Sequence, residues 1–373
     1  MRLHIMKRDL GKKIWMYTIL IIIIGLVALY SASHENVRVH QKIFYDQLYC
    51  AIGGLVIMYF LGRVDYRKFY DVAYLFYFLN IALLVFVLFG GRYALGARRW
   101  MEIGGISFQP SELTKLSLIL VLGRYFSNRR PTLSFGFFSR TQVLLRDLIF
   151  PFFITVIPMF LIFKQPDLGT SLLLFGIFFV MIFTTTLEYR YVLGFLGLCL
   201  AMVPFAWNIL KSYQKDRLLV FLNPNIDPLG AGYTIIQSKI AIGSGQIFGK
   251  GWLAGTQNQL NFLPERHTDF IFSVIGEEWG IIGTLLLVTL YFLLITCSLN
   301  IANQVKDKFG MFVTMGIVAI LTLQVVINVG MVLGLFPIVG LTLPFVSYGR
   351  SSFVIFILMM GFLLNLSKRR TIF

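Results

Sequence analysis

The acidic residue best placed to do chemistry is Asp269, which lies where a long loop meets an apolar run, in the stretch Leu263 to Phe272. If a helix begins at Asp269, its next turns bring Gly276 and Gly280 to roughly the same side. Two such glycines let another helix or a ligand approach closely. A carboxylate at the start of this helix, on the side that carries the two glycines, is either a helix N-cap or a general base. The residues alone leave both interpretations open. His267 is a second candidate base, outside the run.

Glu112 and Lys115 form a second candidate site, three residues apart in the apolar run that follows Gln109 and Pro110. Side chains at that spacing lie on one surface of a helix and can form an ion pair. An ionisable residue inside a membrane span is costly and normally faces a partner or a polar cavity. A structural ion pair and a substrate site are equally compatible with this pattern. Ser111 is a natural helix cap and explains part of the motif by itself.

Arg98 and Arg99 lie in the short loop from Gly96 to Trp100. One interpretation is a snorkelling cluster at the membrane interface with Trp100 as its anchor. The other, which we favour, is phosphate binding, because guanidinium groups bind phosphate in a bidentate manner. Asp167 stands directly before another apolar run, and helix capping is the better explanation for it.

Two adjacent carboxylates, Glu277 and Glu278, lie deeper in the run that Asp269 begins, where each needs a partner. The candidates are Lys115 and an arginine from the long loop. No set of side chains has the pattern of a divalent-cation site, so we expect no dedicated cofactor; an ion such as Mg²⁺ enters only as a partner in neutralising phosphate. The three cysteines lie in apolar runs and predict neither a disulfide framework nor a metal site.

Membrane-spanning helices must position these residues. The chain is 57% hydrophobic and 13% charged, with a mean hydropathy of +0.79, which is typical of a protein dissolved in lipid. Uncharged stretches of roughly 20 residues, the length needed to cross hydrocarbon, recur along it. We therefore predict an all-α integral membrane protein, a single polytopic domain over residues 1–373 with about ten transmembrane helices. The expected spans are residues 14–33, 46–62, 72–90, 112–125, 147–163, 168–187, 191–210, 270–299, 309–334 and 345–366.

The distribution of positive charge predicts the orientation. Short segments rich in Lys and Arg fall on one side, among them residues 2–13, 63–68, 124–146 and 368–370, and the positive-inside rule makes that side and both termini cytoplasmic. The net charge of +16 then needs no nucleic-acid partner, because it reflects this signal and attraction to anionic membrane lipid. The long loop, residues 211–268 between the seventh and eighth spans, is extracytoplasmic. It contains a helix-compatible piece, Tyr233 to Ile242.

The motifs together resemble the SEDS family (shape, elongation, division and sporulation). The resemblance runs nearly end to end, and Gly255–Leu260, followed by Arg266 before His267, resembles the elongation branch of the family more than the division branch. It is carried by Tyr30–Ser33, Gly96–Trp100, Gln109–Lys115, Gln165–Ser171, Asp227–Tyr233, Gly255–Leu260, Leu263–Phe272, Asn328, Gly334, Pro337, Gly340 and Phe345–Gly349.

The resemblance implies a peptidoglycan glycosyltransferase of the bacterial inner membrane. Such an enzyme joins the disaccharide of lipid II to a lipid-linked glycan strand, inverts the anomeric centre and releases undecaprenyl diphosphate. A class B penicillin-binding protein, a transpeptidase, and other membrane proteins of the elongation complex are the implied partners. The essential aspartate of the family matches Asp269, and its important Glu and Lys match Glu112 and Lys115, which settles the alternatives left open above. To substrate binding we assign Arg98, Arg99, Arg217, Lys239, Arg266, His267 and Ser347.

Two positions depart from the family pattern. The signature usually reads Ser-Tyr-Gly-Gly-Ser, whereas here Arg350 follows Gly349, and we expect its charged side chain to snorkel toward the outer surface. Asn223 stands where many relatives carry Asp, so it receives no catalytic role.

The chemistry that these residues predict is glycosyl transfer at the outer face. A sugar hydroxyl attacking an anomeric carbon needs a base, here Asp269, and the departing diphosphate needs positive charge, here from Lys115, Arg98 and Arg99. Glu112 would position Lys115. Two rivals are a flippase that moves lipid II across the bilayer and a scaffold that only anchors the penicillin-binding protein. The gathering of charged residues toward one side, without symmetric halves, favours the enzyme.

Overall fold

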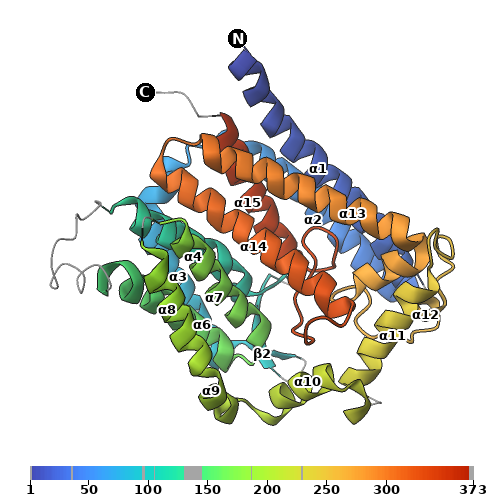
Figure 1. Cartoon of the computed structure of the whole chain (residues 1–373). Helices are drawn as coiled ribbons and strands as arrows, with labels where there is room; N and C mark the ends of the chain where they lie inside the picture. The colour runs from blue at the N-terminus through green and yellow to red at the C-terminus, as the bar shows by residue number, and fades with distance from the viewer. Residues whose placement is uncertain are drawn as a thin grey trace. The chain divides into compact units, whose positions relative to one another are not determined.

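The computed structural model describes residues 2–34, 37–94, 97–104, 106–129, 145–185, 187–227 and 230–368, which are mostly helical (Figure 1). Several residues of the predicted basic segments and motifs lie outside these ranges: Gly96, Arg130, Arg140, Pro228, Leu229, Arg369 and Arg370. The elements, in chain order, are α1 (Arg2–Ser33), α2 (Val37–Leu61), α3 (Arg67–Gly90), β1 (Arg92–Ala94), β2 (Ala97–Ile103), β3 (Ile106–Phe108), α4 (Pro110–Ser127), the π-helical turn η1 (Leu145–Ile149), α6 (Phe150–Lys164), α7 (Leu168–Phe183), α8 (Tyr189–Ala201), α9 (Val203–Ile209), α10 (Ser212–Leu222), the 3₁₀ turn η2 (Pro224–Ile226), α11 (Ala231–Ser244), α12 (Thr256–Gln259), α13 (Ile271–Gln304), α14 (Lys308–Val332) and α15 (Arg350–Lys368).

The chain groups into two compact units, each described here by itself. The first unit comprises residues 1–64, 212–298 and 321–368. In it, α15 packs along α2 and α1, and α10 to α12 follow one another before α13 begins. The buried face of α15 is almost entirely apolar, from Phe353 to Leu366, because this helix is enclosed by protein rather than by solvent or lipid.

The second unit comprises residues 65–211 and 299–320, together with the C-terminal residues 369–373 that the structure does not describe. Here α3 packs on α4, and α6 packs on α7. Between α3 and α4 the chain forms an antiparallel three-stranded meander in the order β1-β2-β3. The sequence analysis predicted no strands, because segments of three to seven residues are too short to show an alternating pattern.

The predicted membrane spans all overlap helices. Among the described residues, seven helical stretches are long and apolar enough to cross a membrane, and α7 and the pair α8–α9 are shorter apolar helices. The remaining predicted span corresponds to α4, whose 18 residues carry Glu112, Lys115 and Arg124 and are therefore less apolar. The chain is thus a multi-pass helical membrane protein, and the number of ten crossings stays a prediction.

Two predicted spans differ from the helices in their bounds. The span 191–210 is two helices that meet at Met202, because Pro204 in the first turn of α9 lacks the backbone N–H that a continuous helix requires. The span 345–366 begins later than predicted, at Arg350, because Phe345 has φ +66°, a left-handed conformation that a helix excludes.

The long segment 211–268 is not an open loop. It contains α10, η2, α11 and α12, and α11 confirms the predicted helix over Tyr233–Ile242. Asn223 caps the turn η2 through its side-chain oxygen, which accepts a hydrogen bond from the backbone N–H of Asn225 at 3.2 Å. This local role agrees with the absence of a catalytic assignment for Asn223.

Candidate active site

Asp269 lies in the first unit, two residues before α13, and its side chain is half-buried. The backbone at Asp269 is held by Asn328 of α14, whose amide nitrogen donates to the Asp269 carbonyl at 3.0 Å and to the Leu341 carbonyl at 2.7 Å. A Cβ atom at Gly340 would lie 3.5 Å from Oδ2 of Asp269, so the carboxylate abuts the connection between α14 and α15. Asn328 therefore links the candidate base to that connection.

Two predicted cations contact the same connection, residues 333–349. Arg217 of α10 donates from Nη1 to the Ile338 carbonyl at 3.3 Å. Lys239 of α11 is exposed, and its ammonium group lies against Gly334, where an added Cβ would come within 2.6 Å of Nζ. Gly334 has φ +72°, so a side chain there would meet both backbone strain and the lysine. Asp269, Arg217 and Lys239 thus converge on one short segment.

The final part of this connection contains Ser347 and contacts His267, which lies before α13. The hydroxyl of Ser347 accepts a hydrogen bond from the Leu343 N–H at 2.7 Å, and Ser347 is 3% exposed. The carbonyl of His267 accepts from the Tyr348 N–H at 2.8 Å. Arg350, the departure from the family pattern, begins α15 and pairs with Asp46 of α2 at 3.5 Å. The charged side chain is therefore accommodated by an acidic partner on α2, which the sequence analysis did not foresee.

Burial lowers the pKa of His267 below its usual value of 6.5; the neighbouring charge of Glu265 opposes this shift and that of Arg266 adds to it. A histidine whose pKa is lower in the folded chain stabilises the fold above about pH 6.5, and that contribution is lost as the pH falls through the folded-state pKa. We expect the melting temperature to decrease from pH 7.5 to pH 5.5, and to decrease less in His267→Gln. Thermal unfolding of both proteins in the same detergent measures this difference, and equal decreases would contradict the assignment.

In the second unit, the predicted pairing of Glu112 and Lys115 is confirmed. Lys115 Nζ donates to Glu112 Oε1 at 2.7 Å, and the two side chains are 0% and 9% exposed respectively. The second carboxylate oxygen of Glu112 is buried and has no hydrogen-bond partner among the described residues. An acceptor left in this state costs free energy unless another group binds it.

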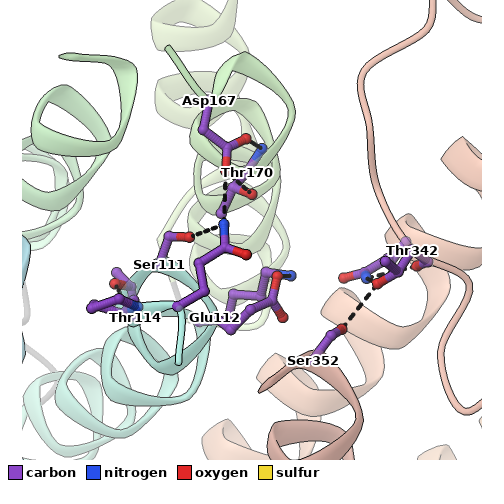
Figure 2. A network of polar contacts seen from close by, with 11 residues as sticks. Ser111, Glu112, Thr114, Asp167, Thr170, Thr342 and Ser352 are labelled. Carbon is purple, nitrogen blue, oxygen red and sulfur yellow. Dashed lines mark hydrogen bonds and ion pairs between the residues drawn. The ribbon is translucent and has the colours of Figure 1, made fainter. Parts of the chain in front are cut away.

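A polar network surrounds the start of α4 (Figure 2). The amide nitrogen of Gln109 donates to the Ser111 hydroxyl at 2.8 Å and lies 3.4 Å from Oδ2 of Asp167. Asp167 accepts from the backbone N–H and the hydroxyl of Thr170, both at 3.0 Å, which confirms it as the N-cap of α7. The interpretation of Ser111 as a helix cap was wrong: the N-cap position belongs to Gln109, because Pro110 with its fixed φ starts the helix two residues earlier than a Ser111 cap would.

Arg98 and Arg99 have different partners. Both lie on β2, where consecutive side chains point to opposite faces. Arg99 Nε donates to the Gln165 carbonyl at 2.8 Å and its Nη2 donates to the Pro166 carbonyl, whereas Arg98 Nη1 donates to the Phe89 carbonyl at 3.0 Å. The strand separates two guanidinium groups that the sequence analysis treated as one cluster.

The partners of the deeper carboxylates correct a prediction. Glu277 forms an ion pair with Lys250 of the long segment, at 2.7 Å, whereas the prediction named Lys115 or an arginine. Glu278 accepts from the Ser31 hydroxyl and from the Asn258 amide, the latter at 3.1 Å. The predicted substrate residue Arg266 donates to the Ala32 carbonyl at 2.7 Å and to the Asn258 carbonyl, so it ties the start of α13 to the end of α1.

The predicted site residues therefore fall into two groups. Asp269, Arg217, Lys239, Arg266, His267 and Ser347 belong to the first unit, and Glu112, Lys115, Arg98 and Arg99 belong to the second. The closeness of Asp269 to Glu112 and Lys115 stays a prediction. Sequence reasoning gave no role to Gln109, Asn328 or Lys250. The signal for Asn328 was an amide side chain, one of two with Gln324, in a long uncharged run, where such a group must find partners.

Comparisons with a family model and with individual relatives identify the same family. A family model for cell cycle proteins, covering FtsW, RodA and SpoVE, matches residues 12–372. The peptidoglycan glycosyltransferase MrdB of Escherichia coli is 40% identical over 364 residues, covering 95% of this chain and 93% of MrdB. The peptidoglycan glycosyltransferase RodA of Treponema pallidum is 31% identical, covering 93% of this chain and 95% of the relative.

Solved structures agree with these relatives. The crystal structure of the rod-shape-determining protein RodA of Thermus thermophilus matches with a TM-score of 0.70 and 30% identity, covering 96% of each chain. A chain from a peptidoglycan synthase complex, described as showing structural coordination of polymerization and crosslinking, matches with a TM-score of 0.80 and 32% identity, covering 96% of this chain and 97% of the other.

Proposed function

The chain belongs to the cell cycle protein family of FtsW, RodA and SpoVE, and on that premise we propose how its residues act as a peptidoglycan glycosyltransferase. The substrate is lipid II, and the product is a glycan strand that remains lipid-linked. The observation that carries the proposal is the convergence of Asp269, Arg217 and Lys239 on the connection between α14 and α15. An acid–base group and cations at one segment are what glycosyl transfer from a lipid diphosphate requires.

The proposed reaction has one base and one leaving group. Asp269 accepts the proton of the attacking sugar hydroxyl as its oxygen forms a bond to the anomeric carbon. The bond between that carbon and the diphosphate breaks, the diphosphate leaves with the electron pair, and the configuration inverts. Glu265 lies four residues earlier but is exposed at the surface, whereas Asp269 is half-buried and held through its backbone by Asn328. The more restrained carboxylate is the better base because proton transfer depends on position.

Positive charge for the diphosphate comes in this proposal from Lys239 and Arg217 in the first unit, and the phosphate contacts predicted for Lys115, Arg98 and Arg99 in the second unit are a separate proposal. Glu112 orients Lys115 through their buried ion pair. Among the described residues, no group of three or more His, Cys, Asp or Glu could hold a metal ion. We keep a divalent cation such as Mg²⁺ as a partner in neutralising the substrate diphosphate, and no step above depends on it.

The membrane setting supports the same proposal. Multiple apolar helices make the chain a multi-pass membrane protein. We place both termini in the cytoplasm on the distribution of Lys and Arg, which puts Asp269 toward the periplasmic or outer face, where lipid II is available after translocation. A class B penicillin-binding protein is the proposed transpeptidase partner, in line with the solved synthase complex that this chain resembles.

A polymerisation assay tests the function. The full chain, purified in detergent or in nanodiscs, is incubated with fluorescent lipid II, with and without the penicillin-binding protein, and the products are separated by gel electrophoresis. We expect a ladder of glycan strands. Translocation of lipid II in vesicles without polymer would identify a flippase, and an inactive chain that still binds the penicillin-binding protein would identify a scaffold.

A further inference from the structure

Helix α13 is interrupted at Gly280, which has φ 64° and ψ −158° and is not helical. The interruption leaves backbone groups on both sides without helical partners. Backbone atoms of the segment 245–251 supply them: Lys250 N and Gly251 N donate to the carbonyls of Glu277 and Glu278, both at 3.0 Å. On the other side, Ile281 N and Ile282 N donate to the carbonyls of Gln246 and Ile247, at 2.9 Å and 3.2 Å. The segment 245–251 thus caps both halves of α13.

Glycines make this close approach possible. A Cβ atom at Gly249 would lie 2.1 Å from the Glu278 carbonyl oxygen, and one at Gly245 would lie 1.9 Å from the Gly276 carbonyl oxygen. A side chain at Gly280 would lie 2.5 Å from both Gly249 N and the Ile247 carbonyl oxygen. Real Cβ atoms essentially never come this close, so both the kink and its cap require glycine at these positions.

The Glu277 carboxylate also binds this segment and the residues that follow it, through side-chain hydrogen bonds. It is 1% exposed and accepts four hydrogen bonds: from Lys250 Nζ at 2.7 Å, the Thr256 hydroxyl at 3.1 Å, Gln257 N at 2.9 Å and Asn258 N at 3.2 Å. Lys250 Nζ also donates to the Thr256 hydroxyl at 2.7 Å. A buried carboxylate needs this many donors to offset the loss of water. The bonds join the part of α13 before the kink to residues 250–258.

We propose that Lys250 and Glu277 are positioning residues for the glycosyltransferase reaction, which fix the part of α13 before the kink and thereby hold Asp269 in place. This inference rests on the proposed role of Asp269. The segment Ile271–Trp279 between Asp269 and the kink is short. A displacement of Glu277 near the kink therefore also displaces Asp269 at the other end of the segment. The same segment is also attached through the hydrogen bond of 2.9 Å between Ser273 and Ser238, whose hydroxyl donates to the Val332 carbonyl at 2.7 Å, and through the bonds of Glu278 to Ser31 and Asn258.

Steady-state kinetics of the full chain in nanodiscs with fluorescent lipid II test the proposal. We expect Lys250→Met to lower kcat by about 10- to 100-fold, because small displacements of a catalytic group cost this much, while KM changes less than about 2-fold. Lys250→Arg should recover most of the rate. Glu277→Gln should also lower kcat, and the double variant Lys250→Met/Glu277→Gln should lose less than the product of the two single losses, because the contact between Lys250 and Glu277 is removed in both.

The matched control is Lys42→Met, which removes an exposed lysine of α2 in the same unit and should leave both constants unchanged. If Lys250→Met folds poorly, Thr256→Val removes only one hydroxyl of the network and should lower kcat by about 5-fold. Wild-type kcat in Lys250→Met or Thr256→Val, or a rise in KM with kcat retained, would overturn the positioning role. An active Asp269→Asn variant would instead overturn the proposed base, so the two failures are distinguishable.

Discussion

Replacing Asp269 with Asn is expected to lower the rate of glycan polymerisation by about 10²- to 10⁴-fold, the range that a general base contributes. Asn has nearly the same size but cannot accept a proton from the sugar hydroxyl. The Asn328 side-chain amide donates to the backbone carbonyl of residue 269 and not to its side chain, so the local fold should persist. Initial rates with purified lipid II measure the loss, and co-purification with the penicillin-binding protein measures whether partner binding is intact.

The matched control for this variant is Glu265→Gln. Glu265 lies in the same segment, but it is exposed, and its carboxylate accepts a surface hydrogen bond from Thr268 at 3.1 Å. Its replacement should leave polymerisation unchanged. If Asp269→Asn polymerised lipid II as fast as Glu265→Gln, Asp269 would not be the base.

Replacing Lys115 with Met is expected to destabilise the protein by about 3–5 kcal/mol, because it leaves the buried Glu112 carboxylate without its cation. Lys115 is fully buried and pairs with Glu112 at 2.7 Å, so solvent cannot compensate for the lost charge. Thermal unfolding in detergent measures the decrease. The same variant should also lose polymerisation, which by itself does not separate a structural role from a role at the substrate.

The double variant Glu112→Gln/Lys115→Met separates these two roles. It removes both charges and should recover most of the stability lost in Lys115→Met, since no uncompensated ion remains buried. If the pair acts on the diphosphate, polymerisation stays low despite the recovered stability. Recovery of both stability and activity would show that Glu112 and Lys115 are only a structural ion pair.

The sequence alone predicted features that depend on composition or on residues a few positions apart. The helical membrane class followed from the recurrence of apolar runs. The pairing of Glu112 with Lys115 followed from their spacing of three residues on one helix, and the capping by Asp167 followed from its place before an apolar run. Local geometry of a helix is the same in any fold, so these predictions did not require knowledge of the tertiary structure.

Only the tertiary structure decided which distant residues meet. It paired Glu277 with Lys250 across 27 positions, Arg350 of α15 with Asp46 of α2, and Asp269 with the glycine turn at Gly340. The tertiary structure also revealed the kink at Gly280 and the strand that separates Arg98 from Arg99, neither of which the sequence predicted. Side chains so far apart in the chain meet only through helix packing and backbone conformation. An apolar run in the sequence predicts neither which helix packs beside it nor where the helix bends.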